Sequence, residues 1–152
     1  MDTETSTIPD LYLVVGYDGS PPSARALDAA VGLLHGRAGR IDVMYVAHLS
    51  SLDTLSADAV AETEATFGDI AKELNTSAGE RLRGREDRWR FEWQQGVISE
   101  VLVEAATRLH DEHPGDNVAI VVGSSSQAMH RIIGSVAVSL ARRAPVPVVI
   151  VP

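Results

Sequence analysis

Cysteine is absent from this sequence of 152 residues. The absence excludes disulfide bonds, thiolate catalysis and cysteine metal sites, and it fits a reducing compartment. Long apolar runs are also missing, since no stretch approaches the roughly 20 residues of a membrane span. The polar, acidic residues 1–10 lack the basic start and apolar centre of a secretory signal. We therefore expect a cytoplasmic protein with a flexible segment over residues 1–10 and a single domain over residues 11–152.

Basic residues are scarce. The sequence has 13 Lys and Arg against 21 Asp and Glu, which gives a net charge of −8. Binding to nucleic acids or anionic membranes requires a basic surface, so this balance argues against both kinds of partner. A small nucleotide is still compatible with it, because a few backbone N–H groups can bind phosphate without a basic surface.

Apolar runs and helical periodicity alternate along the chain. The five runs that predict strands are residues 11–15, 41–47, 88–94, 117–122 and 148–151. Between them, apolar residues at helical spacing predict helices from Pro21 to Gly36, over 57–83, between Gly96 and His113, and over 135–143. In the third strand Trp89, Phe91 and Trp93 alternate with polar residues, which is typical of a strand near a sheet edge.

Strict alternation of strands and helices predicts an α/β fold with a parallel sheet covered by helices on both faces. In such sheets ligands bind beyond the carboxyl ends of the strands, where the winding direction reverses. Two strand ends here carry unusual loops, residues 16–20 after the first strand and residues 123–135 after the fourth.

The second of these loops is the stronger candidate for a ligand site. Gly123 allows a close backbone approach, and the three serines that follow it carry hydroxyl donors. Gly134 and Ser135 open a helix, whose first N–H groups are unpaired and favour an anion. The alternative is structural, with Gly123 as an ordinary strand terminator and Gly134-Ser135 as a simple helix cap.

The remaining polar residues offer less. Asp18 could accept a hydrogen bond from a ribose hydroxyl or an adenine amine, although an Asp-Gly-Ser sequence is also typical of a turn. The five histidines have no metal-ligand spacing. The sequence has no Walker loop, dinucleotide fingerprint or nucleophile elbow, and we identify no catalytic set of residues.

Three segments together resemble the universal stress protein family, and the resemblance covers residues 11–152. Residues 14–20 read VVGYDGS and precede a helix. Residues 121–124 read VVGS and are followed at 134–137 by GSVA, and residues 143–151 read RAPVPVVIV. The resemblance implies a five-stranded parallel sheet of order 3-2-1-4-5, of the adenine nucleotide alpha hydrolase-like type, and a homodimer that often pairs through its last strand.

The resemblance also implies an ATP site, with Mg²⁺ as a possible companion of the nucleotide. By match to the family's motif, Asp18 would contact ribose or base, with Gly16 and Tyr17 beside it in the same loop, and Val46 would line the adenine pocket. The residues that match the phosphate cradle are Gly123, Ser124, Ser126, Gly134, Ser135 and Val136.

Two features of the loop depart from the family's ATP-binding pattern. Ser126 occupies the position of its second glycine, and the loop is two residues shorter. Three functions therefore stay open. The first is a nucleotide-binding regulator or sensor of the stress response with unknown protein partners, and the second is a dimeric interaction protein without a nucleotide. The third is an enzyme acting on an adenylated or phosphorylated substrate, for which the sequence supplies no identifiable base.

Overall fold

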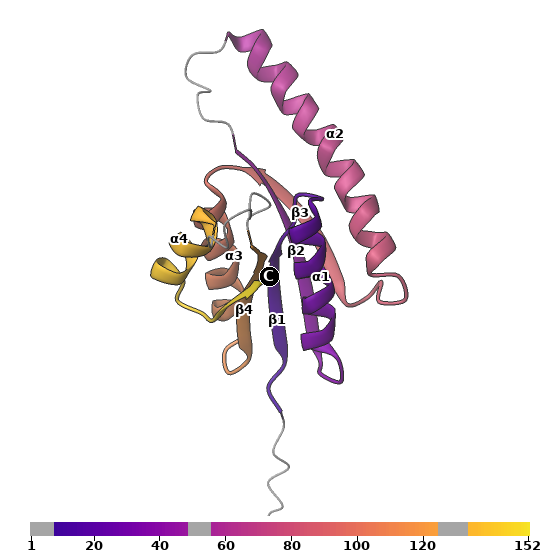
Figure 1. Ribbon diagram of the computed structural model, residues 1–152, viewed down its shortest axis with the longest axis vertical. Helices are drawn as coiled ribbons and strands as arrows, with labels where there is room; N and C mark the ends of the chain where they lie inside the picture. Colours follow the sequence, from indigo (N-terminus) through magenta and orange to yellow (C-terminus); the bar gives the residue numbers. More distant parts are fainter. Residues whose placement is uncertain (1–7, 49–55, 125–133) are drawn as a thin grey trace, which may run out of the picture.

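A central parallel sheet organises the chain (Figure 1). The computed structural model describes residues 8–48, 56–124 and 134–152. Its five strands lie in the order β3-β2-β1-β4-β5, and all four strand pairs are parallel, which confirms the predicted topology. The elements are β1 (Leu11–Gly16), α1 (Pro21–Leu34), β2 (Gly39–Ala47), α2 (Ala57–Arg81), β3 (Trp89–Gln95), α3 (Ile98–Glu112), β4 (Asn117–Gly123), α4 (Ser135–Arg143) and β5 (Val148–Val151).

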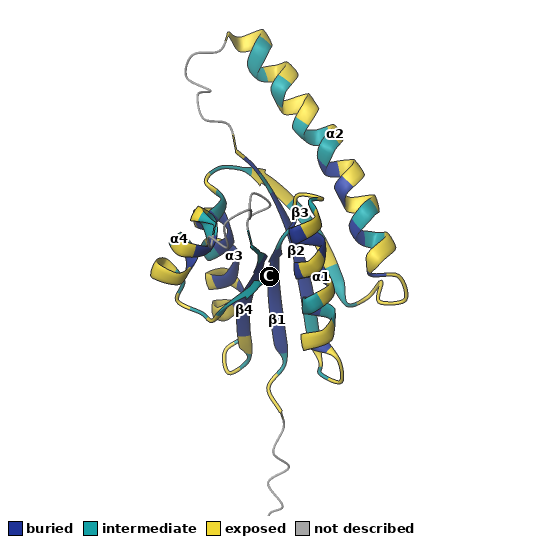
Figure 2. Cartoon of the chain, in the orientation of Figure 1, coloured by how far each residue is buried: buried dark blue, intermediate teal, exposed yellow. Residues whose placement is uncertain are grey.

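Side-chain alternation along the strands divides the core into two layers. Leu13 and Val15 point to the face covered by α1 and α2, while Tyr12 and Val14 point to the face covered by α3 and α4. The central strands β1 and β4 are buried on both faces, which explains why their sequences are continuously apolar (Figure 2).

The sheet edge at β3 is packed on one face only. Its three aromatic residues lie under α2, where Gly79 is close enough that an added Cβ would lie 3.5 Å from the indole of Trp89. On the other face of the sheet, the buried carboxylate of Asp42 is held between Arg40 (2.6 Å) and Arg90 (2.8 Å). The predicted edge position of the third strand is thus confirmed.

No helix in the described part of the chain combines the length and the apolar character that crossing a membrane requires.

Candidate functional site

A pocket of about 250 Å³ opens at the carboxyl ends of β1, β2 and β4, where the sheet order reverses. Every predicted site residue that the structure describes lies in its wall, whereas Ser126 falls outside the described residues. The pocket is lined by Gly16, Tyr17, Asp18, Ser20, Pro22, Ser23, Met44, Val46, Ile98, Leu102, Val122, Gly123, Ser124, Gly134, Ser135, Val136 and Ala137.

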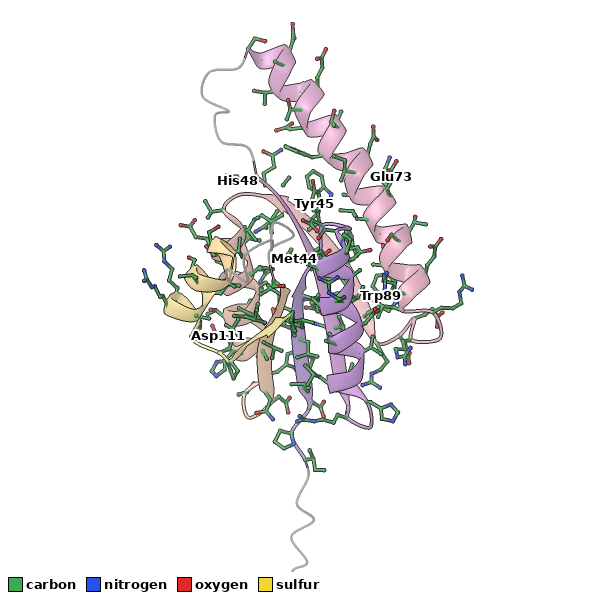
Figure 3. All side chains as sticks on the ribbon, in the orientation of Figure 1. Met44, Tyr45, His48, Glu73, Trp89 and Asp111 are labelled. Atoms are coloured by element: carbon green, nitrogen blue, oxygen red, sulfur yellow. The ribbon has the colours of Figure 1, made fainter. Side chains whose placement is uncertain are left out.

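The floor of the pocket is apolar. Met44, Leu102 and Val122 are almost fully buried beneath it, and Figure 3 places Met44 near the middle of the molecule below the strand ends. Gly16 lies on the same floor, where an added Cβ would come within 3.3 Å of Leu102 Cδ1. A flat apolar group such as a nucleobase could pack on this surface.

One wall of the pocket is the turn between β1 and α1, which satisfies its own polar groups. Ser20 is the N-cap of α1, and its Oγ accepts a hydrogen bond from the Ser23 N–H. Ser23 Oγ accepts one from the Asp18 N–H (3.3 Å). The first two helical residues are Pro21 and Pro22, which have no N–H to donate. The start of α1 therefore offers no free backbone donor in its first three positions.

Asp18 is exposed at the pocket rim and keeps its carboxylate ionised. Its Oδ1 accepts a hydrogen bond from the Ser20 N–H (2.9 Å). Desolvation raises the pKa of Asp18, but hydrogen bonds from Ser20 and Ser23 outweigh that effect and hold the pKa below its usual value of 3.8. At neutral pH the group is thus a hydrogen-bond acceptor, suited to a sugar hydroxyl or an amine.

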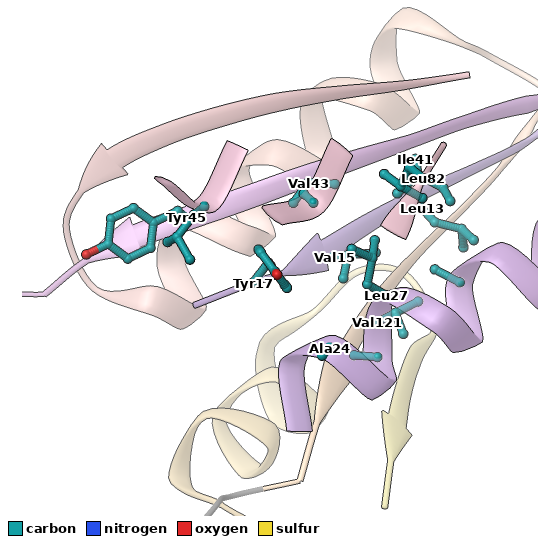
Figure 4. Packing of buried hydrophobic residues seen from close by; sticks show 14 of the residues in the cluster. Leu13, Val15, Tyr17, Ala24, Leu27, Ile41, Val43, Tyr45, Leu82 and Val121 are labelled. Atoms are coloured by element: carbon teal, nitrogen blue, oxygen red, sulfur yellow. The ribbon is translucent and has the colours of Figure 1, made fainter. Parts of the chain in front are cut away.

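Tyr17 contributes its main chain to the pocket. Its side chain is 3% exposed and packs in the opposite layer (Figure 4). There its hydroxyl and Ser77 Oγ of α2 are hydrogen bonded to each other. The phenol therefore cannot contact a ligand on the pocket side of the sheet.

Val46 brings backbone groups to the pocket as well as an apolar side chain. The Met44 carbonyl accepts a hydrogen bond from the Tyr17 N–H on the β1 side (2.9 Å), and the Ala47 carbonyl accepts one from the Gly96 N–H on the β3 side (3.1 Å). Successive residues of a strand direct these groups to opposite neighbours, so the Val46 N–H and C=O point to the β1 side, beyond the end of that strand. Neither group has a backbone partner among the described residues.

The end of β4 is fixed by packing. A Cβ on Gly123 would overlap the carbonyl of Pro22 in α1 and lie 2.8 Å from the Pro22 Cβ. Glycine is therefore required here by the contact between β4 and α1, a structural reason that the sequence did not reveal. The Ser124 N–H is also engaged, because it donates to the Val151 carbonyl of β5 (2.8 Å). Of the two donors of Ser124, only the side-chain hydroxyl can therefore donate toward the pocket.

The opposite wall is the start of α4. Gly134 is the N-cap in an extended conformation, with no side-chain cap, and the first helical hydrogen bond runs from Val138 N–H to Gly134 C=O (3.1 Å). The N–H groups of Ser135, Val136 and Ala137 precede that bond and have no partner among the described residues. Three donors and the positive end of the helix dipole thus lie beside the pocket, an arrangement that favours an anion.

Within the described ranges, no group of three His, Asp or Glu side chains is arranged to hold a metal ion.

The sequence model of the universal stress protein family matches residues 13–152. The chain belongs to this family. A search of curated protein sequences returns no match.

Solved structures of universal stress proteins share the fold. UspA from Lactobacillus plantarum is 16% identical, with a TM-score of 0.75 over 96% of this chain and 100% of that one. A universal stress protein in complex with cAMP is 24% identical, with a TM-score of 0.63 over 96% and 99% of the two chains. A family member from Arabidopsis thaliana with AMP bound is 11% identical, with a TM-score of 0.59 over 93% and 90%.

Eight pocket residues were not predicted from the sequence: Ser20, Pro22, Ser23, Met44, Ile98, Leu102, Val122 and Ala137. Met44 could have been found, because it is two positions from Val46 on the same strand and so shares its face. Ser23 could have been found from its spacing to the helix cap Ser20. Ile98 and Leu102 depend on how α3 rotates against the sheet, which no local pattern specifies.

Proposed function

We propose that this universal stress protein binds an adenine nucleotide, ATP in particular, in the pocket between β1, β2, β4 and α4, and acts as a nucleotide-dependent regulator or sensor of the stress response. The observation that carries the proposal is the start of α4, where three N–H groups without a partner among the described residues lie beside a pocket with an apolar floor. Phosphate binds well to such helix starts, and a base packs well on such a floor.

The polarity of the pocket orients the nucleotide. In this arrangement the phosphate end lies at Ser135, Val136 and Ala137, with the Ser124 hydroxyl beside them. The base lies over Met44 and toward Val46. The Val46 N–H and C=O, which have no backbone partner in the described part of the chain, can pair with the hydrogen-bonding edge of adenine. The Asp18 carboxylate then accepts hydrogen bonds from the ribose or the base.

The same residues favour binding over turnover. Asp18 is the one carboxylate of the pocket wall as the structure describes it, and the low pKa of its carboxyl makes it a poor general base at neutral pH. Mg²⁺ would enter as part of a Mg-ATP complex. The structures of relatives that hold cAMP or AMP support a nucleotide ligand.

Titration calorimetry tests the proposal, with ATP, ADP and AMP each measured with and without Mg²⁺. We expect saturable binding, weakened by Asp18→Ala, with at most slow release of phosphate from ATP. No heat and no thermal shift at about millimolar nucleotide would contradict it.

We also propose that the chain forms a homodimer through β5. This edge strand carries four partly exposed apolar residues, Val148 to Val151, and pairs with β4 on its inner side. An exposed apolar edge favours pairing with another strand. Light scattering should give twice the monomer mass, whereas a monomer at all concentrations would contradict this proposal.

A dimeric interaction protein without a nucleotide is the second candidate. It is favoured by the engaged Ser124 N–H, which removes one backbone donor from the phosphate side of the pocket. This candidate predicts a dimer whose melting temperature is unchanged by ATP, ADP or AMP.

A further inference from the structure

Tyr17 connects the pocket with the opposite layer of the molecule. Its main chain lies in the pocket wall, while its side chain passes to the other face of the sheet and is buried against α1 and α2. There the phenol hydroxyl and the Ser77 hydroxyl of α2 are hydrogen bonded to each other. A movement of the Tyr17 main chain therefore displaces a side chain that contacts α2 directly.

A second contact joins the same loop to the same helix. Gly19 has a φ of +81°, and a Cβ at this position would lie 2.8 Å from Leu74 Cδ2 of α2. Glycine thus allows the loop to approach the helix closely. Tyr17 and Gly19 flank Asp18, so α2 touches the loop on both sides of the carboxylate that faces the pocket.

These contacts lie in the half of α2 that contains its buried residues. The structure describes α2 in full, and its buried residues are Ala71, Leu74 and Ala78, all in its C-terminal half. The N-terminal half has no buried residue and projects beyond the sheet (Figures 1 and 2). Phe67 and Ile70 add partly buried contacts with the core, and the loop adds its own contacts at Leu74 and Ser77.

We propose that occupancy of the pocket is transmitted to α2 through the Tyr17–Ser77 hydrogen bond and the Gly19–Leu74 contact. The inference rests on the proposed nucleotide site. A ligand held at Asp18 restrains the loop in the conformation on which α2 packs, so ligand binding and docking of α2 favour each other. Coupling of this kind is reciprocal, and weakening the contact with α2 must also weaken the binding of nucleotide.

Hydrogen exchange with AMP and ATP as probes measures the coupling on the full chain. In the wild type, saturating nucleotide should slow exchange in the anchored half of α2, residues 70–81. Ser77→Ala and Tyr17→Phe each remove the hydrogen bond. Both should reduce this added protection and lower nucleotide affinity by roughly twofold to tenfold, the range for one net hydrogen bond.

Thr76→Ala is the matched control. Thr76 is next to Ser77, but its hydroxyl is exposed and donates to the carbonyl of Lys72 in its own helix. This variant should keep both the affinity and the nucleotide-dependent protection of the wild type.

The possible failures are distinguishable. If the wild type binds no adenine nucleotide, the proposed function and this inference both fall. If it binds nucleotide but exchange in α2 does not change, only the inference falls. If Ser77→Ala speeds exchange in α2 even without ligand, the nucleotide affinity of this variant is the deciding measurement. A nucleotide affinity equal to that of Thr76→Ala would overturn the coupling.

Discussion

Among the helices that begin at the wall of the pocket, α1 and α4 differ in their first turns. The start of α1 is closed, because Pro21 and Pro22 have no N–H and the Ser23 N–H is bonded to the Ser20 cap. The start of α4 is open, because its cap is Gly134 and the N–H groups of its first three residues have no partner among the described residues.

The difference shows that a helix start does not by itself make an anion site. Both of these helices direct the positive end of their dipole to the pocket, but of the two α4 alone has first-turn N–H groups without a partner among the described residues. In the proposed nucleotide site, proline and serine at α1 and glycine at α4 therefore favour the α4 wall for the phosphate and the Asp18 wall for hydroxyl or amine donors.

The largest expected effect comes from closing the start of α4. Ser135→Pro removes one N–H, and proline is accepted here because it is the first helical position and Gly134 is extended (ψ 157°). A lost hydrogen bond to a charged group is worth about 1.5–3 kcal/mol, so phosphate-dependent affinity should fall by roughly tenfold or more, as measured by calorimetry.

Ser135→Ala is the control for this change, since it removes the hydroxyl and keeps the N–H. It should weaken binding less than Ser135→Pro does. Equal affinities for the two variants would show that the backbone donor at this position has no role.

The contact between the end of β4 and the first turn of α1 should be the next most sensitive feature. Gly123→Ala forces a Cβ into the first turn of α1 and should lower the free energy of unfolding by about 1–3 kcal/mol, as found for overpacked interiors. Urea denaturation measures the loss. Gly32→Ala in α1, where an added Cβ meets nothing within 4 Å, should instead stabilise the protein by up to about 1 kcal/mol. An unchanged stability of Gly123→Ala would mean that β4 and the start of α1 can move apart.

Removing the N-cap of α1 tests whether the α1 wall takes part in phosphate binding. Ser20→Ala should cost about 1 kcal/mol of stability, a typical value for a lost N-cap, because the Ser23 N–H loses its acceptor. Affinity for the phosphate group should stay within about twofold, since this wall does not hold it. If Ser20→Ala lowered the affinity for AMP more than the affinity for adenosine, α1 would be shown to contribute to phosphate binding.

The smallest effect concerns the titration of Asp18. Its pKa is below the usual value of 3.8 in the folded protein, so its stabilising contribution is present above that value and is lost as pH falls through the lower folded pKa. The stability difference between the wild type and Asp18→Asn should therefore be constant from about pH 5 to 8 and shrink below about pH 4. Denaturation curves at several pH values measure this stability difference. A difference as large at about pH 2 as at neutral pH would refute the lowered pKa.

Much of the fold could be predicted because each element has a local pattern. Continuous apolar runs predicted the strands β1 and β4, and alternating aromatic residues predicted that β3 lies near a sheet edge. Helix α2 ends at Arg81, two residues before its predicted end, because Leu82 leaves the helix as its C-cap and is fully buried.

The site was less predictable because parts of it depend on how distant segments approach each other. The requirement for Gly123 arises from Pro22, about a hundred residues earlier, and the Ser124 N–H is taken up by the last strand. Tyr17 was predicted as a ligand contact, although strand alternation from Leu13 and Val15 already directs its side chain to the opposite face.

The most direct test of the central claim is the response of three backbone amides to ligand. In a ¹⁵N-labelled sample, AMP should shift the amide signals of Ser135, Val136 and Ala137 strongly, because phosphate accepts their hydrogen bonds. Adenosine, which occupies only the Asp18 and Val46 side, should leave them nearly unchanged. Saturable AMP binding that moves these three signals no more than adenosine does would contradict the assignment of the phosphate to α4.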